Sequence, residues 1–361
     1  MKGAYSMDLL QMIADFSNAN GPSGFEDEVL TVARKHAPVD SKIEEDSLRN
    51  LYFYRNVHSG SKPVVQLDAH SDEVGFMVQA IRPNGTLRFL PLGGWVNSNI
   101  PAHKVLVKNR DGQWISGITV AKPPHFMTAE EKNRTPALEE MSIDVGASSL
   151  EEAQKEFGIR VAAPVVPDVT FEYDKKHDLM FGKAFDNRLG CAAIQATLDL
   201  LGNESLSVDV VGAMATQEEM GTRGATVTAR RVKPDIAIVF EGSPADDTVV
   251  EPWLSQTAIH KGPMLRHIDA RMITNPRFQR YALDLAEKLG IPVQESVRSG
   301  GATNGAPIHL SNLGIPCIVI GLPVRYIHSH YGIASLEDFR NGVRLAVEII
   351  KRLDKDTISA F

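Results

Sequence analysis

Apolar residues recur along the chain in two patterns, which predict alternating helices and strands. Spacing of three or four residues predicts a helix that carries Leu9, Leu10 and Ile13, and further helices at 25–36, 186–201, 278–289 and from 335 onward. The last of these begins with Ser335-Leu336-Glu337-Asp338, which is similar to a capping box. Short apolar runs between Gly, Pro and Asn turns predict strands at 63–67, 86–90, 104–108, 207–215, 235–240 and 315–320.

One internal segment differs from the rest of the chain in its predicted secondary structure. Residues 73–164 contain short strands separated by turns, which predicts a small β-rich module. Strands and helices alternate beyond it, the pattern typical of a mainly parallel sheet with helices on both faces. The sequence therefore predicts an α/β fold, with a mixed, mainly parallel sheet flanked by helices. Residues 1–72 and 165–361 would form this domain, and 73–164 would be inserted into it.

Composition excludes several classes of protein. The 361 residues are 43% hydrophobic and 23% charged, as in an ordinary globular protein. A net charge of −7 without a basic tract argues against nucleic acid as a partner. The longest apolar run, 315–324, contains two prolines and is shorter than the ~20 residues of a membrane-spanning helix. No secretion signal is recognised at the start, and Cys191 and Cys317 lie in apolar segments, so we expect a cytoplasmic protein.

Residues able to bind metals follow several predicted strands. In an open α/β sheet, ligands bind beyond the carboxyl ends of the strands. The candidates at such positions are His70 with Asp72, Glu218 with Glu219, Glu241 and His328, together with Asp186 where a loop enters a helix. Imidazoles and carboxylates suit zinc, cobalt or manganese.

A charge count favours two cations over one. Asp186, Glu219 and Glu241 would bring three negative charges as ligands, and a hydroxide a fourth, which two divalent cations cancel. The alternative, a structural hydrogen-bonded cluster, would need Lys or Arg partners, because packed carboxylates otherwise raise each other's pKa.

Spacing within the pairs suggests separate roles. If the strand continues, Asp72 lies on the same side as His70 and can accept its second ring N–H, although it can equally be a turn residue. Adjacent residues point apart, so one of Glu218 and Glu219 can bind metal while the other acts as general base; a solvated strand end is the alternative. Asp186 can equally cap a helix. Spacing does not choose between His328 and His330.

Two longer motifs carry a family resemblance: DAHSDEVG at 68–75 and TQEEMGTRGA at 216–225. The chain resembles the tetrahedral aminopeptidase family of dinuclear metallopeptidases, which includes glutamyl and deblocking aminopeptidases. The likeness covers nearly the whole chain, from GPSGFE at 21–26 to RYIHS at 325–329.

The resemblance implies a role for each candidate. Asp186 would bridge two metal ions, His70 and Glu241 would complete one site, and Glu219 and His328 the other. Asp72 would orient His70, and Glu218 would be the general base. The resemblance also implies an inserted β domain that helps to build large homo-oligomers, typically dodecamers assembled from dimers.

Three positions depart from the family pattern. Glu241 stands where Asp is common, Asn304 where an acidic residue is usual, and His330 where Pro is frequent. A carboxylate one methylene longer remains a competent oxygen ligand, but it can change the metal spacing or preference.

The expected activity is hydrolysis of the first peptide bond of short peptides by metal-activated water. An amide hydrolase or deacylase with the same site, and a non-catalytic oligomeric scaffold, are the alternatives. The basic residues Lys261, Arg266, His267 and Arg271 would favour an acidic first residue, unless they only lie on a solvated loop.

Overall fold

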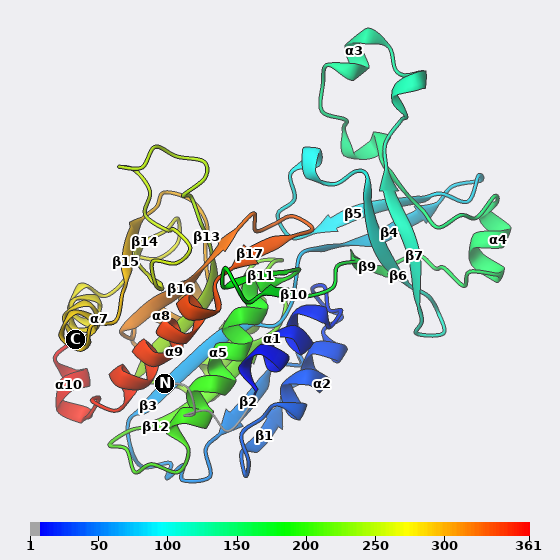
Figure 1. The fold of residues 1–361 in the computed structure, drawn as a ribbon. Helices are drawn as coiled ribbons and strands as arrows, with labels where there is room; N and C mark the ends of the chain where they lie inside the picture. The colour runs from blue at the N-terminus through cyan, green and yellow to red at the C-terminus, as the bar shows by residue number, and fades with distance from the viewer. Residues whose placement is uncertain (1–7) are drawn as a thin grey trace.

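The computed structural model describes residues 8–361 and contains two bodies (Figure 1). A large sheet flanked by helices forms the main body, and a small barrel projects from it. The first seven residues, on which the expectation about a secretion signal partly rests, lie outside the described part. None of the helices within residues 8–361 is long and apolar enough to cross a membrane.

Within residues 8–361, the main sheet has 11 strands and a parallel centre. Its four central strands, β12, β3, β13 and β16, pair in parallel, and antiparallel strands extend both edges. Strands β14 and β15 branch from β16. In sheet order the strands are β1 (Lys42–Glu45), β2 (Leu51–Tyr54), β12 (Asp209–Ala215), β3 (Val64–His70), β13 (Ile236–Pro244), β16 (Cys317–Arg325), β17 (Gly332–Ala334), β11 (Leu179–Gly182) and β10 (Glu172–Asp174), with β14 (Met264–Ile268) and β15 (Gln294–Val297) off this path.

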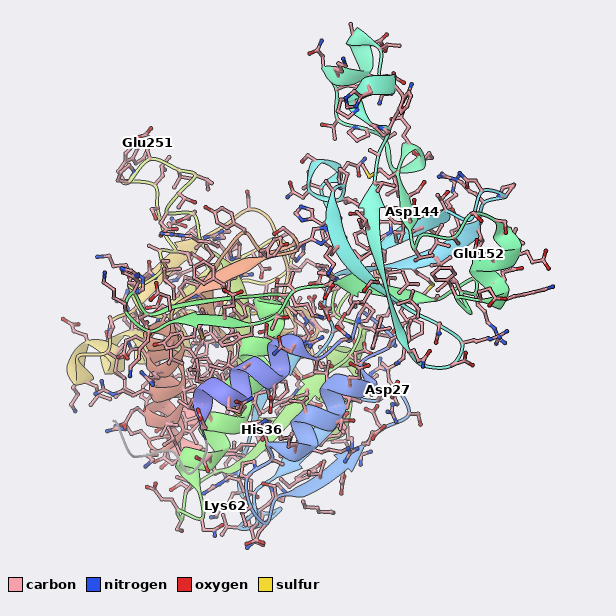
Figure 2. The ribbon with its side chains drawn as sticks, turned by 45° about the vertical axis from the view of Figure 1, so that its right-hand side comes forward. Asp27, His36, Lys62, Asp144, Glu152 and Glu251 are labelled. Carbon is pink, nitrogen blue, oxygen red and sulfur yellow. The ribbon has the colours of Figure 1, made fainter. Side chains whose placement is uncertain are left out.

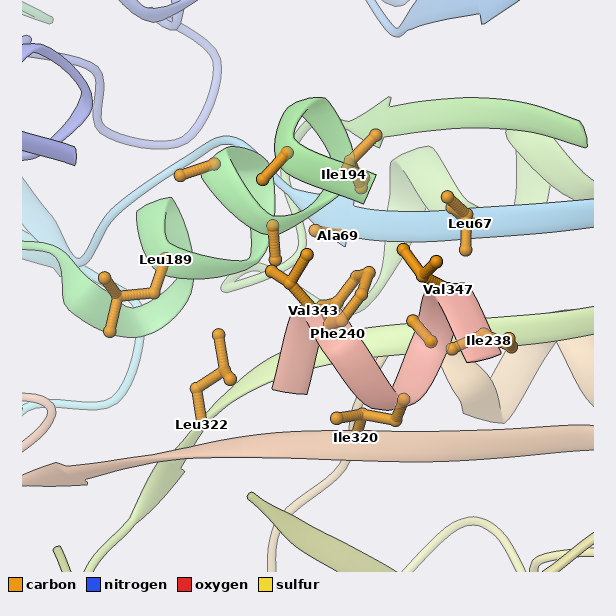
Figure 3. Close-up of a cluster of buried hydrophobic side chains, with 14 of the residues drawn as sticks. Leu67, Ala69, Leu189, Ile194, Ile238, Phe240, Ile320, Leu322, Val343 and Val347 are labelled. Carbon is orange, nitrogen blue, oxygen red and sulfur yellow. The ribbon is translucent and has the colours of Figure 1, made fainter. Parts of the chain in front are cut away.

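Alternate side chains of the central strands enter two separate cores. Ile238 and Phe240 of β13 pack with Val343 and Val347 in the larger core (Figure 3), whereas Val239 lies in a smaller core. This follows from the two-residue period of a strand. Helices therefore cover both faces. The larger core takes in α1 (Leu9–Asn18), α2 (Asp27–Lys35), α5 (Phe185–Leu201), α7 (Pro276–Leu289) and α9 (Leu336–Ile350), and the smaller core takes in α6 (Arg223–Val232) and α8 (Gly305–His309).

The barrel is closed by antiparallel pairing throughout and has a core of its own. Around it run β4 (Gly75–Ile81), β5 (Leu87–Leu92), β8 (Ser142–Asp144), β7 (Trp114–Val120), β6 (His103–Lys108) and β9 (Pro164–Pro167). Short helices α3 (Ala129–Lys132) and α4 (Leu150–Lys155) belong to the same inserted segment. The final short helix of the main body is α10 (Lys355–Ser359). Figure 2 shows Asp144 of the barrel and Glu152 of α4 away from His36 and Lys62 on the main body.

The predicted class is confirmed: an α/β fold with a mixed sheet and an inserted β-barrel domain. The predicted helices are present, and Ser335 caps α9 by accepting the N–H of Asp338. The strands that carry the site extend further than predicted. Strands β3, β13 and β16 continue to His70, Pro244 and Arg325, so His70 is the last residue of its strand and Glu241 lies inside one. The run of apolar residues ends where the strands reach the polar site, but the backbone pairing between β13 and β16 continues beyond it.

Candidate metal centre

Five side chains predicted from the sequence converge at the carboxyl edge of the parallel strands. The Nε2 atom of His70 lies 3.1 Å from Asp186 Oδ1 and 3.3 Å from Glu241 Oε1. The Nε2 atom of His328 lies 3.4 Å from Asp186 Oδ2 and 3.5 Å from Glu219 Oε1. Asp186 therefore presents one carboxylate oxygen to each histidine.

Strand register explains why His70 and Glu241 meet. Strands β3 and β13 are parallel neighbours, and Val239 pairs with Asp68. Continuing this register by two residues sets Glu241 beside His70, with both side chains on one face. On the other side of β3, Ala215 at the end of β12 pairs with His70 itself, so the Glu218–Glu219 turn follows at the same edge.

Asp186 is held at the start of α5 by its neighbour Asn187. The peptide bond between the two residues is cis. Asn187 Nδ2 donates to the carbonyl of Phe240 at 2.8 Å, and its Oδ1 accepts the N–H of Gly242 at 3.1 Å. Asn187 thus bonds to the residues on either side of Glu241, which keeps α5 and Asp186 next to that carboxylate.

Asp72 contacts His70 differently from the expectation. Strand β3 ends at His70, and the Nδ1–H of His70 donates to the backbone carbonyl of Asp72 at 3.1 Å, while Asp72 Oδ1 lies 3.5 Å away. The carboxylate of Asp72 instead accepts the backbone N–H groups of Glu218 and Glu219, at 2.9 and 3.1 Å. It therefore holds the turn that carries both glutamates.

We call four carboxylates of this site the acidic cluster: Asp186, Glu218, Glu219 and Glu241. Burial raises the pKa of Glu218 to about 7 and that of Glu219 to about 8, and it raises the pKa of Glu241 well above its usual range. Burial also tends to raise the pKa of Asp186, but its hydrogen bonds and charge attraction to His328 and His70 lower it overall.

The two histidines respond in the opposite sense. Burial lowers the pKa of an imidazolium, but for His328 the hydrogen bond to Asp186 and the charge of Glu219 outweigh this and raise the pKa to about 10. The charge of Glu218 and hydrogen bonds to neighbouring carboxylates likewise raise the pKa of His70 against the effect of burial. In the metal-free protein, protons held by these side chains therefore balance part of the negative charge of the acidic cluster.

Two observations indicate that the site fits divalent cations. Glu241 Oε2 is buried and has no hydrogen-bond partner among residues 8–361. Within the same range, no Lys or Arg nitrogen lies within 4.0 Å of the acidic cluster, whose ion-pair partners are His70 and His328. A structural cluster neutralised by Lys or Arg would need side chains that, in the described part of the chain, are not near these carboxylates. The imidazole nitrogens and carboxylate oxygens of the site are the ligand atoms that zinc and similar ions bind.

The acidic cluster lines a cavity of about 770 Å³. Of the basic residues predicted to face a substrate, Arg266 and Arg271 line this cavity, and Lys261 and His267 do not. His267 instead pairs with Glu295 at 2.7 Å.

Three contributors to the site were missed by the sequence reasoning. Arg298 lines the cavity because it follows β15, which pairs with β14. Gly94 belongs to the barrel, and its carbonyl accepts the Nδ1–H of His328 at 2.9 Å. Glu26 accepts the backbone N–H of Gln217 at 3.1 Å. Strand and domain contacts create all three arrangements, and no local sequence signal marks them.

His330, the alternative to His328, points away from the acidic cluster. Its Nε2–H donates to the Ile100 carbonyl at 3.3 Å, and its ring stacks on His103. Asn304 lies below the site, where its side-chain amide donates to buried Asp68 at 2.7 Å. Of the three positions that depart from the family pattern, only Glu241 therefore contacts the proposed ligands directly.

A cluster of imidazoles and carboxylates above parallel strands, open to a cavity, defines a metallohydrolase on an α/β sheet. Residues 50–345 match the family described as M42 glutamyl aminopeptidase. The glutamyl aminopeptidase of Lactococcus lactis subsp. cremoris is 30% identical over 355 residues, covering 98% of this chain and 99% of the relative.

Solved structures agree with this match. The TET aminopeptidase of Thaumarchaeota archaeon SCGC AB-539-E09 is 36% identical with a TM-score of 0.92, covering 98% of this chain and 99% of that chain. The TET1 peptidase of Pyrococcus horikoshii, which can assemble into a tetrahedron or a large octahedral shell, shares the fold at 24% identity with a TM-score of 0.85, covering 96% of this chain and 100% of that chain. The chain belongs to the M42 glutamyl aminopeptidase family and is a metallo-aminopeptidase, a hydrolase of the exopeptidase type.

Proposed function

We propose that this aminopeptidase removes N-terminal residues from short peptides with two divalent cations held by the five converging side chains. His70 and Glu241 would hold one ion, Glu219 and His328 the other, and Asp186 would bridge them. The observation that carries this proposal is the position of the Asp186 carboxylate between the two histidines. Its Oδ1 lies 3.1 Å from His70 Nε2 and its Oδ2 lies 3.4 Å from His328 Nε2. Zinc or cobalt suits these donors best, and manganese also fits.

When bound, the ions supply Lewis-acid chemistry, which polarises the scissile carbonyl and lowers the pKa of water. Glu218 is the general base of the proposal. Its carboxylate lines the cavity, and its Oε2 lies 3.8 Å from His70 Nε2. It takes the proton of the attacking water and then donates it to the departing amine. Burial raises its pKa to about 7, which suits a group that must both accept and donate a proton near neutral pH.

The cavity favours peptides with an acidic first residue. Arg266, Arg271 and Arg298 all line it, and guanidinium groups bind carboxylates with paired N–H donors. Arg266 and Arg298 already pair with Asp269 at 3.3 Å and with Asp246 at 3.1 Å, whereas Arg271 has no ion-pair partner among residues 8–361 and is available to a substrate carboxylate. We therefore propose that the enzyme prefers Glu or Asp at the N-terminus of its substrate.

The proposal includes a homo-oligomer, a dodecamer assembled from dimers, with residues 73–164 as the domain that contributes to assembly. The tetrahedral assembly of the P. horikoshii relative supports it. Large apolar side chains are exposed on both bodies, with Phe126 72% and Trp253 80% exposed, as expected of surfaces that are covered in an oligomer. We place the enzyme in the cytoplasm, in agreement with free cysteines at Cys191 and Cys317.

Metal analysis and a substrate panel test the activity together. Purified native protein should contain two divalent ions per chain and should hydrolyse aminoacyl substrates with a free amine, with Glu and Asp faster than Leu. Substrates with an acetylated amine should not react. Hydrolysis of the acetylated substrates at equal rates would instead indicate an amide hydrolase or deacylase. A metal-loaded protein without activity on any amide would indicate a scaffold.

A further inference from the structure

A glycine pair of the barrel lies directly against two of the proposed metal ligands. Gly93 and Gly94 follow β5. A Cβ atom at Gly94 would lie 2.9 Å from His328 Nδ1, and one at Gly93 would lie 3.0 Å from Glu219 Oε2. The Gly94 carbonyl accepts the Nδ1–H of His328 at 2.9 Å, so Nε2 is the ring nitrogen that faces Asp186. The barrel backbone therefore lies against two ligands of one proposed metal position, His328 and Glu219.

The loop that carries His328 is fixed to the barrel a second time, through His330. The His330 ring, 1% exposed, lies 4.1 Å from the ring of His103 and 5.0 Å from that of Trp95, centroid to centroid. Its Nε2–H donates to the Ile100 carbonyl at 3.3 Å. Trp95 is itself held, because its Nε1–H donates to the Gly75 carbonyl at 3.1 Å. His330 thus inserts a side chain of the main body among rings of the barrel.

This loop needs external support. Tyr326 and His328 have φ values of 63° and 56°, a left-handed conformation that residues other than glycine rarely adopt. Such a backbone persists when the surrounding contacts determine it. His70 does not share this requirement, because it ends β3 and pairs with Ala215 of β12 in the sheet.

We propose that His330 is a positioning residue through which the barrel holds the His328 and Glu219 half of the metal centre. The other half, His70 and Glu241, is held within the main body, by strands β3 and β13 and by Asn187 of α5. This inference rests on the proposed function, since it assigns His328 and Glu219 to one of two metal ions. It makes the inserted barrel part of the catalytic centre of its own chain, in addition to any role in assembly.

Metal titration of the full-length, metal-free protein tests the inference. Co²⁺ is added while its absorption spectrum and the heat of binding are followed, first with the wild type and then with His330→Ala. The wild type should bind two ions. His330→Ala should bind one of them about 10–100-fold more weakly, the usual effect of losing a residue that supports a ligand, and the other with unchanged affinity.

Two further variants separate positioning from folding. Gly94→Ala changes an exposed glycine and removes no core contact, and its Cβ would press on His328, so it should cause the same selective loss. Ile159→Val is the matched control: it loosens the barrel core at a buried residue that is not among the contacts of His330, and it should leave both affinities unchanged. Thermal unfolding of the metal-free proteins reports the cost of each change to the fold.

The outcomes distinguish the inference from the proposed function. A wild type that binds fewer than two ions overturns the dinuclear proposal. Suppose that the wild type binds two ions and that His330→Ala and Gly94→Ala each leave both ions bound normally, or weaken the binding of both ions equally. That result overturns only the role of His330. A selective loss in these two variants and not in Ile159→Val supports it.

Discussion

The carboxylate of Asp72 accepts the backbone N–H of Glu218 at 2.9 Å and, through its other oxygen, that of Glu219 at 3.1 Å. Ser23 donates its hydroxyl to the same carboxylate at 2.5 Å, and Asp72 is fully buried. One buried side chain therefore sets the backbone of both the proposed base and a proposed ligand.

Asp72→Asn should lower both activity and stability. An amide offers one oxygen acceptor in place of two, so one backbone N–H of the turn loses its partner. We expect kcat to fall about 10–100-fold, as for other residues that support metal ligands. The free energy of unfolding should fall by about 1–3 kcal/mol, the cost of a buried unsatisfied group. Kinetics and urea unfolding measure the two effects, and a wild-type kcat would contradict the role of the turn.

Glu218→Gln should bind metal normally and turn over slowly. The amide keeps the size of the side chain but cannot accept and return a proton, so kcat should fall about 10²–10⁴-fold. Metal content by elemental analysis and steady-state rates check this. Glu251→Gln, on an exposed loop (Figure 2), is the control and should match the wild type. Near-normal turnover by Glu218→Gln would remove it as the base.

Metal binding should release protons and weaken as the pH falls. Without metal, Glu219 has a pKa raised to about 8 and His328 one raised to about 10, so both hold protons at pH 7. Bound ligands must be deprotonated, so lowering the pH from 8 to 6 should favour the metal-free form. Calorimetry in buffers of different ionisation heat measures the protons released. A metal affinity that does not change with pH would contradict the proposal that Glu219 and His328 hold protons in the metal-free protein.

Arg271→Ala should reduce the preference for acidic substrates. Arg271 is exposed and lines the cavity, so its loss removes a partner for an incoming carboxylate with little effect on the fold. We expect kcat/KM for a Glu substrate to fall about 10-fold, the loss of one charge-assisted hydrogen bond, with the Leu substrate unaffected. Lys261→Ala, outside the cavity lining, should change neither rate. Equal losses on both substrates would argue against a role in specificity.

Glu73→Gln should strongly destabilise the protein. The buried carboxylate of Glu73 lies 2.7 Å from Lys183 Nζ and 3.2 Å from Arg188 Nη2, and both cations are also buried. The amide would leave these charges without compensation, at a cost of about 3–5 kcal/mol. Denaturant unfolding measures the loss. Glu151→Gln, which breaks only the exposed pair with Lys155, should cost less than about 1 kcal/mol.

The sequence by itself determined the alternation of strands and helices, the β-rich insertion and the set of metal-ligand candidates. Periodicity is a local property, because the two-residue and 3.6-residue repeats follow from backbone geometry within each element. Ligand chemistry is likewise local, since it depends on side-chain type. These signals were sufficient for the fold class and for naming candidate ligands such as His70 and Asp186.

Only the tertiary structure decided which side chains meet. The sequence preferred His328 to His330 as a candidate ligand from the family resemblance alone. In the structure, His328 lies against the Gly94 carbonyl, whereas the His330 ring stacks on His103 of the barrel. Arg298 reaches the cavity through the pairing of β15 with β14. His70 and Asp186 are 116 residues apart. Contacts over such separations depend on strand register and on the packing of one domain against the other, which no local pattern encodes.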